Sequence, residues 1–134
     1  MWQNSLRAAE TAVTQQPNDA FTWFNLGTNR LYFGDRAGAV AAYDQARNLG
    51  LPWRMLWYQF GPFDAYHAVG RTGDILTLAD ATLANTRSIE EIHYWRGVAL
   101  AAQGNAEGAR QSWQRALEIN RNFDPALQAL AETG

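Results

Sequence analysis

The sequence predicts an all-α fold, a right-handed solenoid built from about three helix hairpins. Residues 18–52 and residues 88–122 each contain an apolar helix, a Gly-Asp or Gly-Asn turn and an alanine-rich helix. No stretch alternates apolar and polar residues for long enough to indicate a half-buried strand. Because helix hairpins repeated along a chain stack on their neighbours, the repeat and the missing strand pattern together favour a solenoid.

The expected helices follow one another with short connections through the whole chain. They cover residues 3–15, 20–33, 36–48, 53–60, 63–71, 74–85, 89–103, 106–119 and 125–132. They form a single domain, as the length of 134 residues suggests. The domain divides into a half repeat (1–17), a repeat (18–52), a degenerate repeat (53–87), a repeat (88–122) and a C-terminal cap (123–134).

The first full repeat has a glycine and an aspartate at its turn. Gly34 is expected to end one helix in a left-handed conformation, and Asp35 to cap the next helix by accepting amide hydrogens. Gly27 leaves room for close approach of the second helix. From that helix, Ala39 permits the approach and Tyr43 fills the gap between repeats.

The third repeat places matching residue types at the same offsets. Gly97 precedes Gly104 by seven residues, as Gly27 precedes Gly34, and Asn105 and Trp113 follow where the first repeat has an aspartate and a tyrosine. We therefore expect the two hairpins to pack alike.

The middle repeat keeps little of this pattern, and its turn is predicted at Gly73 and Asp74. That position lies 39 residues after Gly34 and 31 before Gly104. The first helix of this repeat is therefore expected to be long and the second short.

The remaining helix ends have signals of their own. Pro17 is expected to end the N-terminal helix, which corresponds to the second helix of a preceding repeat. Ser88 and Glu91 form a capping-box pattern before the third repeat. Asp124 is predicted to cap the last helix, with Pro125 at its first position.

These features resemble the tetratricopeptide repeat (TPR) family over nearly the whole chain. The first repeat has the signature residues Trp23, Leu26, Gly27, Gly34, Asp35, Ala39, Tyr43 and Ala46. In the third repeat, His93 and Arg96 stand where tryptophan and leucine are typical. The resemblance is specific for fold, whereas TPR arrays bind many unrelated partners.

A second, looser resemblance concerns the run from residue 50 to residue 83 and the segment YWRGVALAAQGN that follows. These segments look like repeat tails found behind C39-type papain-like peptidase domains of some bacteria. The chain has no cysteine and therefore cannot contain that catalytic centre. The resemblance implies a peptidase-associated accessory domain.

Composition narrows the partner classes further. The net charge is −2, so there is no excess of basic residues to neutralise a nucleic acid backbone. All the Lys and Arg positions are arginine, so there is no lysine for Schiff-base or P-loop chemistry. No apolar run is long enough for a membrane span, and the N-terminal residues show no signal-peptide pattern. A cofactor is not expected.

The TPR resemblance implies a groove, lined by the first helix of each hairpin, that binds a protein or peptide. Asn25 has no equivalent asparagine in the other repeats, so we expect at most a single backbone contact from it. The expected groove residues are Phe21, Phe24, Asn25, Thr28, Leu31, Tyr32, Phe63, His67, Tyr94 and Val98.

The segment GLPWRMLWYQFGPFDAYHAVG (50–70) crowds aromatic residues around Pro52 and Pro62. Its rings are expected to fill the space opened by an irregular repeat. A functional alternative is a ligand or domain-docking surface. The residues predicted for that surface are Trp53, Arg54, Trp57 and Phe60.

Catalysis and metal binding are not expected. His67 and His93 lie on different repeats, and no nucleophile or metal-ligand motif joins them. We therefore predict a non-catalytic scaffold that binds a protein or peptide. Two alternatives remain open. The chain can be an accessory or substrate-docking domain that is covalently linked to the rest of a larger enzyme, or it can be a homo-oligomerisation module.

Overall fold

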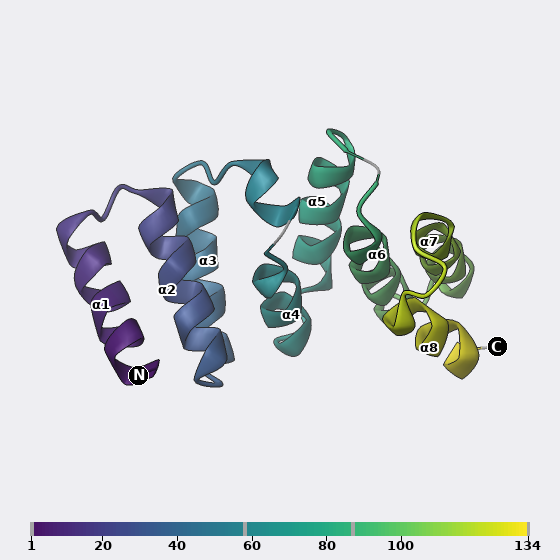
Figure 1. The fold of residues 1–134 in the computed structure, drawn as a ribbon, viewed down its shortest axis with the longest axis horizontal. Helices are drawn as coiled ribbons and strands as arrows, with labels where there is room; N and C mark the ends of the chain where they lie inside the picture. The colour runs from purple at the N-terminus through teal and green to yellow at the C-terminus, as the bar shows by residue number, and fades with distance from the viewer. Residues whose placement is uncertain (1, 58, 87, 134) are drawn as a thin grey trace. The chain divides into compact units, whose positions relative to one another are not determined.

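The computed structural model describes residues 2–57, 59–86 and 88–133, and the side chains of all of these except residues 2–4 and 53. Every regular element in these residues is a helix, which confirms the predicted class (Figure 1). The helices are α1 (Trp2–Gln15), α2 (Ala20–Tyr32), α3 (Arg36–Asn48), the short 3₁₀ helix η1 (Trp53–Trp57), α4 (Gly61–Ala68), α5 (Thr72–Leu83), α6 (Glu90–Ala102), α7 (Ala106–Ile119) and α8 (Asp124–Thr133).

The chain divides into two compact units, Met1–Gly70 (unit 1) and Arg71–Gly134 (unit 2). In unit 1, α2 packs against both α1 and α3. Ala9, Leu26 and Ala42 are buried where these three helices meet, with Trp23 packed beside them. Helix α4 packs against α3 and, less extensively, against α2.

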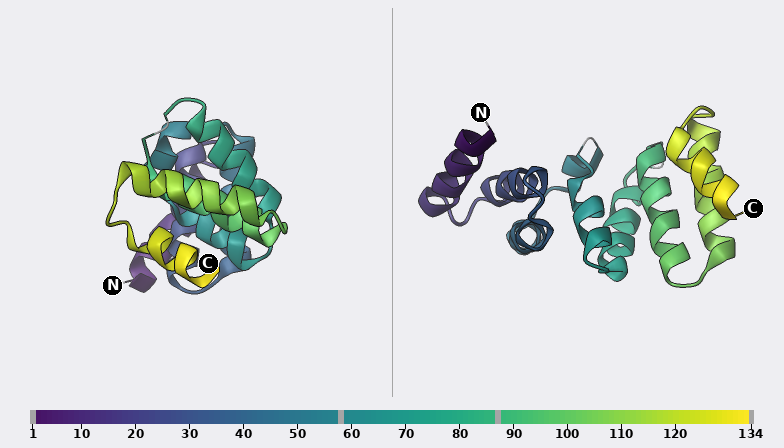
Figure 2. Two further views of the ribbon diagram at one scale, coloured as in Figure 1. Left: turned by 90° about the vertical axis from the view of Figure 1, so that its right-hand side faces the viewer. Right: turned by 90° about the horizontal axis from the view of Figure 1, so that it is seen from below.

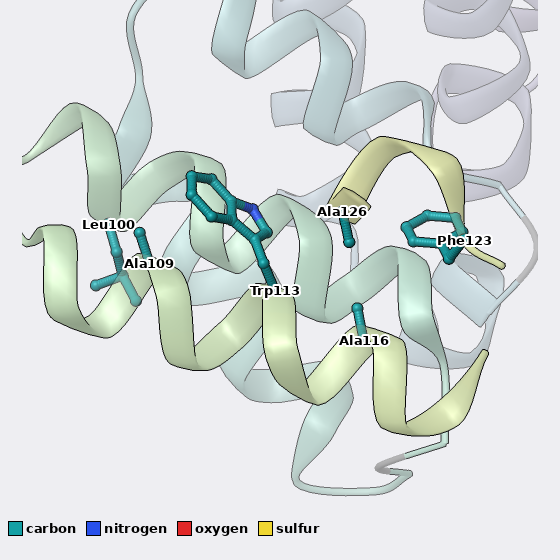
Figure 3. Packing of buried hydrophobic residues seen from close by; sticks show 6 residues of the cluster. All are labelled: Leu100, Ala109, Trp113, Ala116, Phe123 and Ala126. Carbon is teal, nitrogen blue, oxygen red and sulfur yellow. The ribbon is translucent and has the colours of Figure 1, made fainter. Parts of the chain in front are cut away.

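Unit 2 contains the hairpin of α6 and α7, with α5 packed against α6 and α8 against α7 (Figures 1 and 2). Trp113 from α7 lies in its core (Figure 3). The other buried members of this cluster are Leu100, Ala109, Ala116, Phe123 and Ala126.

The predicted turns of the first and third repeats are confirmed. Gly34 and Gly104 have φ angles of 79° and 84°, a region that glycine enters without the steric cost paid by other residues. The side chain of Asp35 accepts a hydrogen bond from the Gly38 amide, and Asn105 makes the equivalent bond in α7, both at 2.9 Å.

The close approach predicted at the two helical glycines is also confirmed. A Cβ on Gly27 would lie 2.7 Å from Cε1 of Tyr43, and one on Gly97 would lie 2.7 Å from Cδ1 of Trp113. In both hairpins the aromatic ring of the second helix therefore occupies the space where a side chain of the first helix would be.

The turn predicted for the middle repeat at Gly73 and Asp74 is wrong. The residue with positive φ is Gly70 (78°), and Gly73 lies in the first turn of α5. The N-cap residue of α5 is Arg71, which makes no side-chain cap, and its Nε donates a hydrogen bond to the Asp74 carboxylate at 2.8 Å. Gly34, Gly70 and Gly104 are then 36 and 34 residues apart, so the middle repeat has a nearly regular length.

Three other local predictions are corrected. The helix expected over 53–60 is a 3₁₀ helix that ends at Trp57, and Pro62 belongs to the first turn of α4, where its missing amide hydrogen costs little. Helix α6 follows Ile89 without a side-chain cap, so Ser88 forms no capping box. The Asp124 carboxylate accepts a hydrogen bond from the Gln128 side chain instead of capping α8.

Candidate functional site

Unit 1 contains a hollow of about 480 Å³ between α2, residues 59–61 and α4, named here the α2–α4 hollow. Its lining combines aromatic and aliphatic surface with hydroxyl, amide and carboxylate groups, a mixture typical of sites that orient a ligand. The lining residues are Thr28, Leu31, Tyr32, Gln59, Phe60, Gly61 and Asp64.

Hydrogen bonds to Tyr66 hold α4 against α3 and so fix one wall of this hollow. The Tyr66 hydroxyl donates to Oδ1 of Asp44 at 2.7 Å and accepts from the Arg47 guanidinium at 3.1 Å. The same guanidinium lies 5.5 Å from the centre of the Tyr66 ring. Because Tyr66 is fully buried, this network attaches α4 at one defined position.

The Tyr43 hydroxyl is close to two residues that line the hollow, Thr28 and Gly61. It shares a hydrogen bond of 3.0 Å with Oγ1 of Thr28, which lines the hollow from α2. A Cβ on Gly61 would collide with the same hydroxyl and lie 3.5 Å from Leu31. Glycine at position 61 therefore lets the start of α4 come close to α2 and α3.

Burial raises the pKa of Tyr43 to about 12. The hydrogen bond from Thr28 opposes this rise, whereas the negative charge of Asp64 adds to it. Burial likewise raises the pKa of Tyr66 to about 12. Both hydroxyls therefore stay protonated in the folded protein well above neutral pH.

We expect the free energy of unfolding to fall as the pH rises from 10 to 12. In the unfolded chain a tyrosine ionises near pH 10, so in this window the unfolded state loses protons that Tyr43 and Tyr66 keep when folded. Their contribution is complete below pH 10 and is lost as the pH passes 12. Urea unfolding at a series of alkaline pH values measures this fall. The Tyr43→Phe variant should show a shallower fall, and an unchanged slope would contradict the assignment to Tyr43.

The structure brings together four of the residues singled out by sequence. Thr28, Leu31 and Tyr32 of the predicted groove line the α2–α4 hollow. Phe60, which was predicted for the docking surface, lines the same hollow as these three residues. The Tyr32 side chain is 70% exposed and offers most of its ring to a partner.

The other groove predictions for unit 1 lie elsewhere. Phe21, Asn25 and His67 are exposed but do not line the hollow. Phe24 and Phe63 are 2% and 0% exposed, so their rings support the walls and cannot contact a partner in this state.

Tyr94 and Val98, the groove residues predicted in unit 2, are both half-buried. The Tyr94 ring packs edge-on against Phe123, which precedes α8, with 6.0 Å between ring centres. The carbonyl of Tyr94 accepts a hydrogen bond from the Trp113 indole at 3.2 Å. Tyr94 thus contributes to the packing of α6 against α7 and α8.

The remaining residues of the predicted docking surface follow one another through η1. The Arg54 side chain is exposed and Trp57 is half-buried. The Trp53 side chain lies outside the described residues. Phe63 and Tyr66 from the same aromatic segment are fully buried, so part of this segment forms core.

Sequence reasoning missed Gln59, Gly61 and Asp64 as lining residues. The signal that could have found Asp64 is its position six residues before Gly70, because Thr28 lies six residues before Gly34. Placing the turn at Gly73 shifted the middle repeat by three residues and aligned Phe63 and His67 with the groove instead.

A second hollow of about 420 Å³ lies in unit 2, lined by Asp80, Leu83, Ala84, His93, Arg96 and Arg115. The Arg96 guanidinium donates to Asp80 at 3.0 Å and to the Ser112 hydroxyl at 3.2 Å. Arg115 pairs with Glu118. Arg96 therefore links α5, α6 and α7, which gives a structural role to a residue that departs from the TPR pattern.

In the described part of the chain, no group of three or more histidine, aspartate or glutamate side chains is placed to hold a metal ion. No described helix combines the length and the apolar character needed to cross a membrane. The residues that line the α2–α4 hollow offer hydrogen-bonding groups, one carboxylate and aromatic surface.

The sequence of α6 and α7 matches a known repeat. The family model for the tetratricopeptide repeat matches residues 90–123. This segment spans the α6–α7 hairpin and ends at Phe123.

Solved structures of MamA have a similar fold. One shares 16% sequence identity, covers 98% of this chain and 76% of MamA, and gives a TM-score of 0.85. A MamA RS-1 double mutant shares 18% identity over 98% of this chain and 73% of its own, also with a TM-score of 0.85. At this identity the likeness shows the fold alone, an α-solenoid of TPR-type hairpins, which confirms the predicted class. No curated protein sequence matches the chain.

Proposed function

We propose that this protein is a non-catalytic scaffold and that its α2–α4 hollow receives a peptide segment of a protein partner. The hollow itself is the observation that supports this proposal most directly. Its lining comes from α2, from α4 and from the residues just before α4. Helix α2 is the first helix of its hairpin, the kind of helix that TPR-type folds commonly use for binding. The matched repeat at residues 90–123 favours the same class of function.

The physical properties of the hollow suit a peptide. Leu31, Phe60 and the exposed Tyr32 ring offer apolar contact area, and a large, rigid aromatic side chain at a rim is a common energetic centre of protein interfaces. Thr28, Gln59 and Asp64 provide polar groups that can fix the orientation of a bound segment. A small apolar ligand would leave these polar groups without partners.

Panning a displayed library of random peptides against the purified chain tests this proposal. Peptides that occupy the hollow should bind the Tyr32→Ala variant about tenfold more weakly, the loss expected for an interface hot spot. Phe33→Ala is the matched control, since Phe33 is the next residue, is 43% exposed and does not line the hollow. Affinities are measured by fluorescence polarisation of the selected peptides.

If the selected peptides bind Tyr32→Ala as tightly as the wild type, the hollow is not the binding site and the proposal fails. The panning is done at a concentration where light scattering gives the mass of a monomer, near 15.0 kDa. A mass that rises with concentration would instead favour the predicted alternative of a homo-oligomerisation module.

A further inference from the structure

The Asp64 carboxylate differs from those of the other aspartates of unit 1, each of which accepts a hydrogen bond from a described residue. Asp19 and Asp35 accept hydrogen bonds from backbone amides at helix starts, and Asp44 accepts one from Tyr66. Among the described residues, no side chain donates a hydrogen bond to the Asp64 carboxylate or forms an ion pair with it. This carboxylate is a lining group of the α2–α4 hollow.

Among the described residues that line the hollow, none has a positive charge that could neutralise Asp64. The uncharged polar groups of this lining include the Thr28 hydroxyl and the Gln59 amide. The charge of Asp64 also adds to the rise in the pKa of the Tyr43 hydroxyl, whose main cause is burial. An incoming cation would meet this charge without displacing an existing partner.

The aromatic lining favours the same kind of occupant. The faces of tyrosine and phenylalanine rings attract a guanidinium or ammonium group, and Tyr32 and Phe60 both line the hollow. The aliphatic stem of a long basic side chain gains contact area from Leu31 while its charged end reaches a polar group. The Gln59 carbonyl and the Thr28 hydroxyl can accept further N–H donors.

We infer that the α2–α4 hollow selects a basic side chain of the partner peptide, with the cation on Asp64 and its stem between Tyr32, Phe60 and Leu31. Arginine fits better than lysine, because its planar guanidinium combines stacking on rings with several directed donors. This inference rests on the proposed function and adds the chemical class of the residue that is bound.

The test uses the peptides selected by panning and replaces their arginine by citrulline, which has the same shape and no charge. We expect binding to the wild type to weaken about tenfold, as for loss of a charge-assisted hydrogen bond. The same replacement should change binding to Asp64→Asn by about twofold or less, because the charge partner is already gone. Glu10→Gln is the matched control, since it removes a carboxylate from α1 of the same unit outside the hollow.

The outcomes separate this inference from the proposed function. Selected peptides that need Tyr32 but carry no basic residue would overturn basic-residue selection and leave the peptide site in place. The same conclusion follows if the citrulline replacement weakens binding to Asp64→Asn as much as it weakens binding to the wild type. A lysine preference over arginine would overturn the guanidinium assignment. Peptides that ignore both Tyr32 and Asp64 overturn the proposed function, and basic-residue selection with it.

Discussion

Replacing Trp113 with alanine is expected to lower the free energy of unfolding by about 3–5 kcal/mol, the range for truncating a large aromatic residue in a core. Trp113 is 4% exposed and is the largest side chain of the unit 2 cluster (Figure 3). Its ring fills the space left by the missing side chain of Gly97, and its indole N–H donates to the Tyr94 carbonyl. Alanine would leave a cavity and remove this hydrogen bond.

Urea unfolding followed by far-ultraviolet circular dichroism measures this loss, because the helix signal does not depend on tryptophan fluorescence. Gln114→Ala is the matched control, since Gln114 is the next residue of α7 and is exposed. Its effect should stay within about 0.5 kcal/mol. A loss below about 1 kcal/mol for Trp113→Ala would mean that the surrounding helices collapse into the cavity, contrary to the packing described.

Phe24→Ala is expected to destabilise the protein by about 3–5 kcal/mol, for the same reason as Trp113→Ala. The Phe24 side chain is 2% exposed, and its ring centre lies 5.2 Å from that of Tyr43. The sequence places Phe24 in the groove, where its loss would weaken a ligand without unfolding the chain. The structure instead buries the Phe24 ring against Tyr43.

Phe21→Ala provides the comparison, because Phe21 has the same residue type on the same helix and is 51% exposed. Its effect on unfolding should stay within about 0.5 kcal/mol. Equal losses for the two variants in urea unfolding would show that Phe24 is not a core residue. A large loss for Phe24→Ala alone would confirm that Phe24 belongs to the core and not to the groove that the TPR resemblance implies.

The prediction of the fold succeeded where the signals lie within one hairpin. Gly34 with Asp35 and Gly104 with Asn105 each specify a turn through the conformational freedom of glycine and a short capping side chain. These interactions join residues a few positions apart. They are therefore visible in the sequence without knowledge of the neighbouring helices.

The turn prediction failed in the middle repeat because a large and a small side chain stand at exchanged positions there. Phe63 lies seven residues before Gly70, where the first and third repeats have Gly27 and Gly97. Ala79 lies nine residues after Gly70, where they have Tyr43 and Trp113. A large residue on the first helix and a small one on the second reverse the pattern of the other repeats. The Gly-Asp pair at residues 73 and 74 therefore resembles the expected turn more closely than Gly70 does.

The sequence by itself determined the all-helical class, the hairpins of the first and third repeats and the aromatic character of residues 50–70, because each depends on local residue types and spacing. The tertiary structure decided which rings are buried and which line a hollow. Phe63 and Phe60 are three residues apart, yet only Phe60 lines the hollow beside Asp64. That difference follows from how α4 is packed against α2 and α3, and such packing depends on contacts between residues far apart in the chain.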